Sequence, residues 1–142
     1  MHRLNLAQSN ALIAAALGHG ESAGMKPLTV SVLDPGGNLI ACARADGASN
    51  IRVKLATAKA AGALALGVSS RTIGTMAEDR PHFIAAVDQM GEGGLVPAAG
   101  GVIVVDGAGV VVGAVGVTGD TSDNDEACAL AGIAAIGMSA KN

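Results

Sequence analysis

The segment GVTGDTSDND, residues 116–125, concentrates three aspartates, several hydroxyl groups and two glycines in one short stretch. A second polar loop begins at Arg44 and includes Asp46. If the two loops lie side by side, they form a pocket of mixed charge. Its further members would be Thr118, Asp120, Asp125, Lys54 and Lys59. The planar guanidinium of Arg44 would suit a carboxylate or a hydroxy-keto group in such a pocket.

Proton transfer is the chemistry that this set of side chains would support. A carboxyl group whose pKa is raised by burial can accept and return a proton, a role that suits Asp46 or Asp125. Lys59 would stabilise an enolate. The candidate catalytic residues are therefore Arg44, Asp46, Lys59 and Asp125.

Two simpler interpretations of segment 116–125 compete with a reactive site. Ser122-x-x-Asp125 has the spacing of a capping box at a helix start. Asp123, Asp125 and Glu126 would also be favoured there by the helix dipole, by about 0.3–1 kcal/mol each. Alternatively, the charged side chains of the two loops form a solvated network of ion pairs.

Several established site patterns are absent from the sequence. An EF-hand counted from Asp120 would need glycine at Asp125 and glutamate at Ala131. The histidines are too scattered for a zinc site, and three aspartates would repel a phosphate near residue 119. No nucleophile elbow is present. Cys42 and Cys128 are isolated, so we expect both to be small buried apolar side chains.

The elements that must position these residues alternate between hairpins and helices. We expect helices over 6–17, 51–66 and 123–139, with a short helix and another turn or two over 69–90. Strands 28–33 and 39–43 flank the turn sequence DPGGN, and a second hairpin surrounds residues 106–109. Both hairpins precede a helix start by the same number of residues. This order predicts an α/β (α+β) fold with one antiparallel sheet covered by helices.

Composition narrows the function classes. The 142 residues favour a single domain, 1–142, and the net charge of −3 with 1% aromatic residues argues against nucleic acid. No apolar run reaches the length of about 18 residues expected of a membrane span. No secretory signal pattern begins the sequence, so we expect a cytoplasmic protein. The alanine-rich helices are apolar on many faces, which predicts a homo-oligomer.

Three stretches of the sequence together resemble a known family. They are VLDPGGNLIACARADGAS, KAAGA and AGGVIVVDGAGVVVGAVGVTGDTSDNDEACALAG. They are similar to the GlcG/HbpS family, also called haem-degrading, which includes the C-terminal domain of PduO-type proteins. The matching residues are Asp34, Arg44, Asp46, Gly47, Lys59, Gly100, Gly101, Gly113, Gly116, Thr118, Gly119 and Asp125. Two positions depart from the family pattern: Thr118 replaces a serine, and Ile103 stands near a usual proline.

The resemblance implies a profilin-like sandwich, with two hairpins and extra strands in a central antiparallel sheet, assembled into homo-oligomers. It implies ligands such as haem or corrinoid-related molecules in some members and roles in small-molecule catabolism in others.

Three functions follow as hypotheses. The first is a small-ligand-binding protein that takes haem or a related tetrapyrrole, with His19 as the axial ligand of the iron and His82 as a lesser candidate. Its expected ligand-binding residues are His19, Arg44, Gly101, Thr118 and Gly119. The second is a cofactor-free isomerase, tautomerase or hydratase acting on a small oxygenated carboxylate. The third is an accessory subunit without chemistry of its own.

Overall fold

The computed structural model describes residues 2–91 and 93–141. One antiparallel sheet in the strand order β2-β1-β4-β3-β5 forms its centre. The strands are β1 (Thr29–Leu33), β2 (Leu39–Arg44), β3 (Gly101–Val105), β4 (Val111–Thr118) and β5 (Ser139–Ala140). The helices are α1 (Leu6–Ser22), α2 (Arg52–Leu66), α3 (Ser70–Asp79), α4 (Pro81–Asp88) and α5 (Ser122–Ala135).

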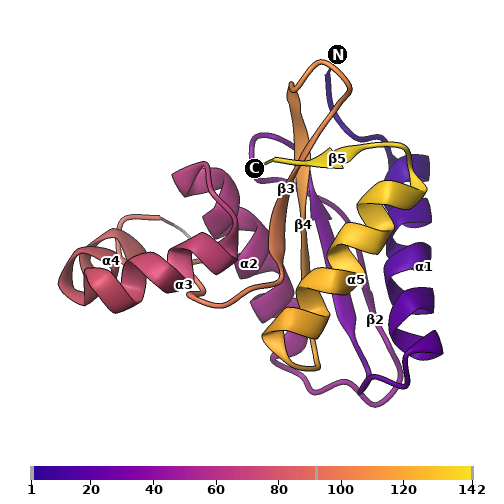
Figure 1. Cartoon of the computed structure of the whole chain (residues 1–142), viewed down its shortest axis with the longest axis horizontal. Helices are drawn as coiled ribbons and strands as arrows, with labels where there is room; N and C mark the ends of the chain where they lie inside the picture. The colour runs from indigo at the N-terminus through magenta and orange to yellow at the C-terminus, as the bar shows by residue number, and fades with distance from the viewer. Residues whose placement is uncertain (1, 92, 142) are drawn as a thin grey trace.

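Helices cover both faces of the sheet (Figure 1). Helices α1 and α5 pack together on one face, and α2 packs on the other face across β1, β4 and β3. This arrangement confirms the predicted α/β sandwich with a central antiparallel sheet. Among the helices described, none is long and apolar enough to cross a membrane.

The same turn chemistry closes both predicted hairpins. In the first, the Asp34 carboxylate accepts hydrogen bonds from the backbone N–H groups of Gly36 and Asn38, at 3.0 and 2.9 Å. In the second, Asp106 accepts from the N–H groups of Ala108 and Val110, both at 2.9 Å. The bond from Asn38 is the largest cause that lowers the pKa of Asp34. The two hairpins pair with each other through β1 and β4.

The two faces of the sheet have different packing. The core beneath α1 and α5 is built from leucine, isoleucine and valine side chains. On the opposite face, glycines let the α2 backbone approach the strands closely. A Cβ atom on Gly116 would collide with the carbonyl oxygen of Ala56, and one on Gly101 would collide with that of Lys59. The many small residues of the sequence are therefore a requirement of this close contact.

Two element boundaries differ from the expectation. Helix α1 continues through two glycines to Ser22, because Gly20 is buried against Leu28, where a side chain has no room. Helix α5 ends at Ala135, and the following residues pair with β3 as strand β5. Pro81 opens helix α4, whose eight residues agree with the further turn or two that we predicted.

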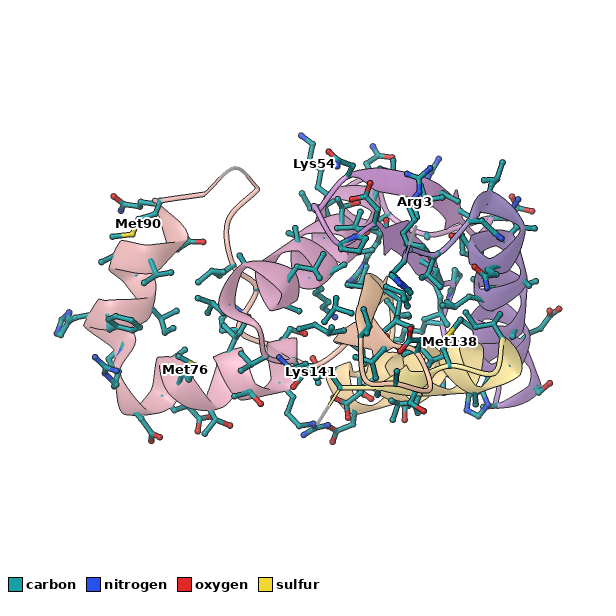
Figure 2. The ribbon with its side chains drawn as sticks, turned by 90° about the horizontal axis from the view of Figure 1, so that it is seen from above. Arg3, Lys54, Met76, Met90, Met138 and Lys141 are labelled. Atoms are coloured by element: carbon teal, nitrogen blue, oxygen red, sulfur yellow. The ribbon has the colours of Figure 1, made fainter. Side chains whose placement is uncertain are left out.

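Helices α3 and α4 form an arm that projects away from the sheet beside α2 (Figures 1 and 2). Helix α4 packs on α3 and makes no comparable contact with other described elements. The arm leaves large apolar side chains in solvent: Phe83 is 41% exposed and Met90 is 79% exposed. The arm thus presents apolar surface to solvent.

Candidate functional site

The N-cap of helix α5 lies one residue earlier in the polar segment after β4 than the predicted N-cap, Ser122. Thr121 is the N-cap, and its side chain accepts a hydrogen bond from the Asn124 N–H at 3.2 Å. The predicted capping box at Ser122 and Asp125 is therefore wrong. Asp125 turns inward instead, where its carboxylate accepts the Asp120 N–H at 2.9 Å.

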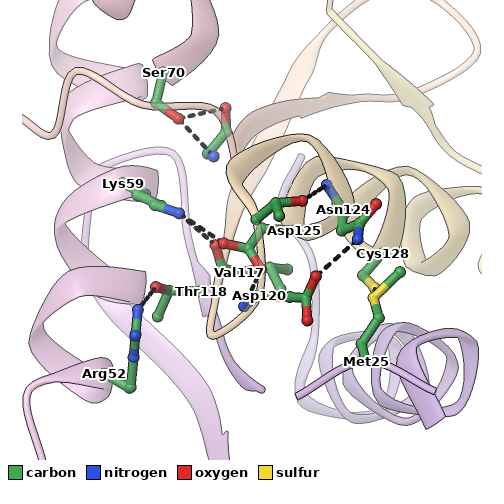
Figure 3. A network of polar contacts seen from close by, with 12 residues as sticks. Met25, Arg52, Lys59, Ser70, Val117, Thr118, Asp120, Asn124, Asp125 and Cys128 are labelled. Carbon is green, nitrogen blue, oxygen red and sulfur yellow. Dashed lines mark hydrogen bonds and ion pairs between the residues drawn. The ribbon is translucent and has the colours of Figure 1, made fainter. Parts of the chain in front are cut away.

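Asp125 forms a buried ion pair with Lys59 of α2 (Figure 3). The Lys59 Nζ atom lies 3.2 Å from Asp125 Oδ2 and donates to the Val117 carbonyl oxygen at 3.0 Å. The two side chains are only 5% and 2% exposed. The pair thus joins the helices of opposite faces at the end of β4, and does not form the solvated network considered from the sequence.

Burial has the largest effect on the titration of Lys59. Loss of solvent lowers the pKa of Lys59, while the charge and hydrogen bond of Asp125 oppose that shift. Arg52 lowers the pKa further by repulsion. A lysine of this kind is a better proton donor than a surface lysine, which is the chemistry that an enolate-stabilising role would need.

The predicted binding residues beside this pair are tightly packed. The Thr118 hydroxyl accepts a hydrogen bond from Arg52 Nη1 at 2.8 Å (Figure 3). Gly119 has φ +143°, and a Cβ atom there would collide with the Pro27 carbonyl oxygen. The Gly101 N–H donates to the Ser70 hydroxyl at 2.7 Å. Packing alone thus explains the absence of a side chain at Gly119 and Gly101.

Arg44 and Asp46 lie elsewhere, on the rim of a cavity of about 530 Å³. The cavity is bounded by the end of α1, the segment before β1 and the end of β2. Its lining residues are Leu17, Gly20, Glu21, Met25, Lys26, Pro27, Leu28, Arg44, Ala45 and Asp46. Both signs of charge surround it, but of the residues predicted for the mixed-charge pocket it holds only Arg44 and Asp46.

The structure thus divides the predicted pocket into two parts. Lys59 and Asp125 are brought together, whereas neither of them lines the cavity that Arg44 and Asp46 share. The two parts meet through the backbone, because the Asp120 carboxylate accepts the N–H of Lys26, a residue of the cavity wall, at 2.9 Å.

His19 lies on the exposed surface of the last turns of α1. Its neighbours Gly20 and Glu21 line the cavity, but His19 does not. No side-chain hydrogen bond or ion pair of His19 is found within the described residues. The imidazole is therefore open to an incoming ligand. His82 is also exposed, but it lies on α4, in the projecting arm.

The cysteines agree only partly with the expectation that both are buried. Cys128 is buried, and its sulfur lies 3.4 Å from that of Met25 (Figure 3). Burial raises the pKa of the Cys128 thiol to about 11. Cys42 is half-buried because β2 is an edge strand. In residues 2–91 and 93–141, no three His, Cys, Asp or Glu side chains gather as metal ligands would.

Comparison with known proteins decides the family. A model described as "Haem degrading protein HbpS-like" matches residues 4–134. The chain belongs to the HbpS-like family. This finding confirms the resemblance seen in the sequence. Among curated proteins, no significant relative of the chain is found.

Solved structures share the fold of this HbpS-like chain. A PduOC:heme complex is 22% identical, with a TM-score of 0.85, over 99% of each chain. HbpS is 28% identical, with a TM-score of 0.81, over 94% of this chain and 90% of its own. Klebsiella pneumoniae protein ORFY is 23% identical, with a TM-score of 0.86, over 96% and 92%.

Sequence reasoning missed two residues of the site in this HbpS-like chain. Arg52, which binds Thr118, opens α2 and received no role because its partner is distant in sequence. Ser70, which accepts the Gly101 N–H, is fully buried at the start of α3. An arginine in the first turn of a helix, where the dipole disfavours a cation, is the signal in the sequence that could have identified Arg52.

Proposed function

We propose that this HbpS-like chain binds a small ligand, and that the ligand is haem or a related tetrapyrrole. Family membership over residues 4–134 is the observation that carries the proposal. The likeness in fold to a PduOC:heme complex supports it.

His19 is the residue that would hold the haem iron. Its imidazole is exposed and has no hydrogen-bond partner in the described chain, so a ring nitrogen can reach a metal. A bound haem would supply an iron centre with redox and ligand-binding chemistry. The chain would contribute an imidazole nitrogen of His19 and the helix that orients it. His19 thus fits the group as a ligand donor.

One copy of the chain gives the haem ring little cover. Phe83, the single aromatic residue, lies on the projecting arm and not on α1. A flat apolar ring at His19 would therefore stay largely in water unless a second copy covered it. We thus extend the proposal to a homo-oligomer in which a neighbouring copy shields the ring.

A haemin titration tests this function. Purified protein should give a saturable shift of the Soret band near one equivalent per chain. His19→Ala should remove or alter the spectrum, and imidazole should partly restore it, because the freed coordination position can take a small nitrogen ligand. The matched control is His82→Ala, which changes an exposed histidine on another helix.

Two results would contradict the proposal. Weak and unsaturable haemin binding would exclude a haem site. Saturable binding that neither histidine variant changes would exclude His19 as the ligand. Circular dichroism of both variants would check that the fold is intact.

The alternative of a cofactor-free enzyme draws support from the lowered pKa of Lys59. The burial of Lys59 and Asp125 works against it, because a substrate must reach the groups that exchange its proton. Arg44 and Asp46 on the cavity rim are the accessible residues of that candidate site.

A further inference from the structure

A row of polar side chains crosses three strands beneath the start of α2. Thr29 of β1 pairs with Arg44 of β2 on one side and with Thr118 of β4 on the other. Paired residues of antiparallel strands direct their side chains to the same face of the sheet. That face is the one that α2 covers, because Ser31, two residues along β1, contacts Thr57 of α2 at 2.9 Å.

Thr29 holds a polar atom that the chain itself does not satisfy. The residue is 0% exposed, and its Oγ1 atom has no hydrogen-bond partner among the residues described. A buried hydroxyl without a partner is costly, and nearly all buried polar groups in native proteins are paired. The position therefore indicates a missing polar group beside Thr29.

Two arginines are linked to the strand partners of Thr29: Arg44 is its partner on β2, and Arg52 is hydrogen-bonded to Thr118, its partner on β4. Arg52 Nη1 donates to Thr118 Oγ1 at 2.8 Å, and Arg44 Nη1 donates to the Ala48 carbonyl oxygen at 2.7 Å. Within the described residues, neither arginine has an acidic partner in an ion pair. Each guanidinium carries five N–H donors, so most of its donors remain available. The missing group is therefore an acceptor with negative charge.

We propose that Thr29, Arg44, Arg52 and Thr118 form a binding site for the carboxylate group of a small ligand. The arginines supply charge and paired N–H donors, which match the two oxygens of a carboxylate. The buried hydroxyl of Thr29 donates the bond that its own chain leaves unused. Because Thr29 and Thr118 are buried, the site has little room, which favours a planar carboxylate over the bulkier phosphate group.

The exposure of the four residues sets the direction of approach. Thr29 and Thr118 are buried, Arg52 is half-buried and Arg44 is exposed. The carboxylate thus enters from the side of the exposed Arg44. This site is separate from His19, and it stands whether or not the protein binds haem.

Thermal unfolding with malonate as the probe tests the site, with sodium chloride at equal ionic strength as the reference. Malonate should raise the melting temperature of the unmodified protein in a saturable way. Arg52→Gln and Arg44→Gln should each weaken malonate binding by about tenfold or more, because each removes a charge-assisted hydrogen bond. Arg80→Gln, an exposed arginine stacked on Phe83 in the arm, should leave malonate binding unchanged.

Thr29→Val separates binding from a structural role. Valine keeps the shape and removes the unpaired hydroxyl, so the ligand-free variant should melt at the same or a higher temperature than the unmodified protein. The same variant should lose most of the malonate effect. A threonine that serves the fold alone would not show these opposite changes.

A second comparison decides whether the carboxylate belongs to a haem propionate or to a free small molecule. It compares the binding of haemin with that of haemin dimethyl ester, in which the propionates are blocked. Weaker binding of the ester, with the difference lost in Arg52→Gln, would assign the site to a propionate arm. Malonate binding without such a difference would assign it to a free carboxylate. The proposal is overturned if neither probe depends on Arg52 and Thr29, if Arg80→Gln weakens malonate equally, or if phosphate stabilises the protein and malonate does not.

Discussion

Lys59 and Asp125 illustrate at the residue scale why the partner of a charge matters more than the charge itself. Asp125 looked from the sequence like a surface cap, whose loss would cost about 0.5–2 kcal/mol. In the structure it neutralises a lysine that is itself enclosed. Removing one member of such a pair leaves the other charge buried and unpaired.

We therefore expect Lys59→Met and Asp125→Ala each to lower the free energy of unfolding by about 3–5 kcal/mol. The double variant should lose less than the sum of the two, because no charge is then left without its partner. Lys54→Met, at an exposed position of the same helix, is the control and should change stability little. Urea denaturation of the four variants and of the unmodified protein provides the measurement. Additive losses would show that the ion pair contributes no coupling.

Asp120 gives a pH dependence at the same scale. The hydrogen bond from the Lys26 N–H, followed by those from Asn124 and Thr121, lowers the pKa of Asp120 from 3.8 to about 2. Because the folded pKa is depressed, the stability from this carboxylate is fully present above pH 3.8 and is lost as the pH falls through about 2.

The free energy of unfolding should therefore fall with decreasing pH across that window. Asp120→Asn should make the fall shallower, since an amide does not titrate. Denaturation midpoints at a series of acidic pH values provide the measurement. An identical slope in the variant would show that other carboxylates account for the acid sensitivity.

At the scale of elements, the contact of α2 with the sheet positions Lys59 and Arg52. Gly101 and Gly116 permit that contact, because a side chain at either would strike the backbone of α2. The glycines of β3 and β4 thus serve the site indirectly. They set the distance between the helix and the strand end where Asp125 and Thr118 lie.

Gly116→Ala should lower the free energy of unfolding by about 1–3 kcal/mol or more, because the added methyl group forces α2 outward. Haemin or malonate binding should weaken with it if the position of α2 sets the site. Gly107→Ala is the matched control, since a Cβ atom there meets nothing within 4 Å. Equal stability of the two variants would contradict the proposed close contact.

At the scale of the whole molecule, the uncovered arm of α3 and α4 favours assembly. Phe83 and Met90 stand in solvent there, and the surface of a monomer rarely leaves such an apolar arm without a partner. We expect light scattering at micromolar concentration to return a multiple of the 13.7 kDa chain mass. Phe83→Glu should lower that mass. A mass of 13.7 kDa for the unmodified protein would contradict the prediction.

The sequence by itself determined the elements and the family. Strand-forming runs and two aspartate-led turns predicted the hairpins, since turn geometry depends on neighbouring residues only. The segments around residues 34–47 and 100–125 carried the family resemblance that the match over residues 4–134 confirms. The sequence also indicated which functional groups the candidate residues carry, because the chemistry of a side chain follows from its residue type and not from the fold.

Only the tertiary structure decided which of those residues meet. Lys59 and Asp125 are 66 positions apart, as are Arg52 and Thr118, and no local pattern links residues at that separation. Their contacts depend on how closely α2 approaches the sheet, which the opposing glycines set. The same packing places Arg44 and Asp46 at a cavity away from Lys59 and Asp125, and leaves the Thr29 hydroxyl without a partner among the described residues. Periodicity fixes which face a side chain occupies, whereas distances between elements arise from packing across the whole core.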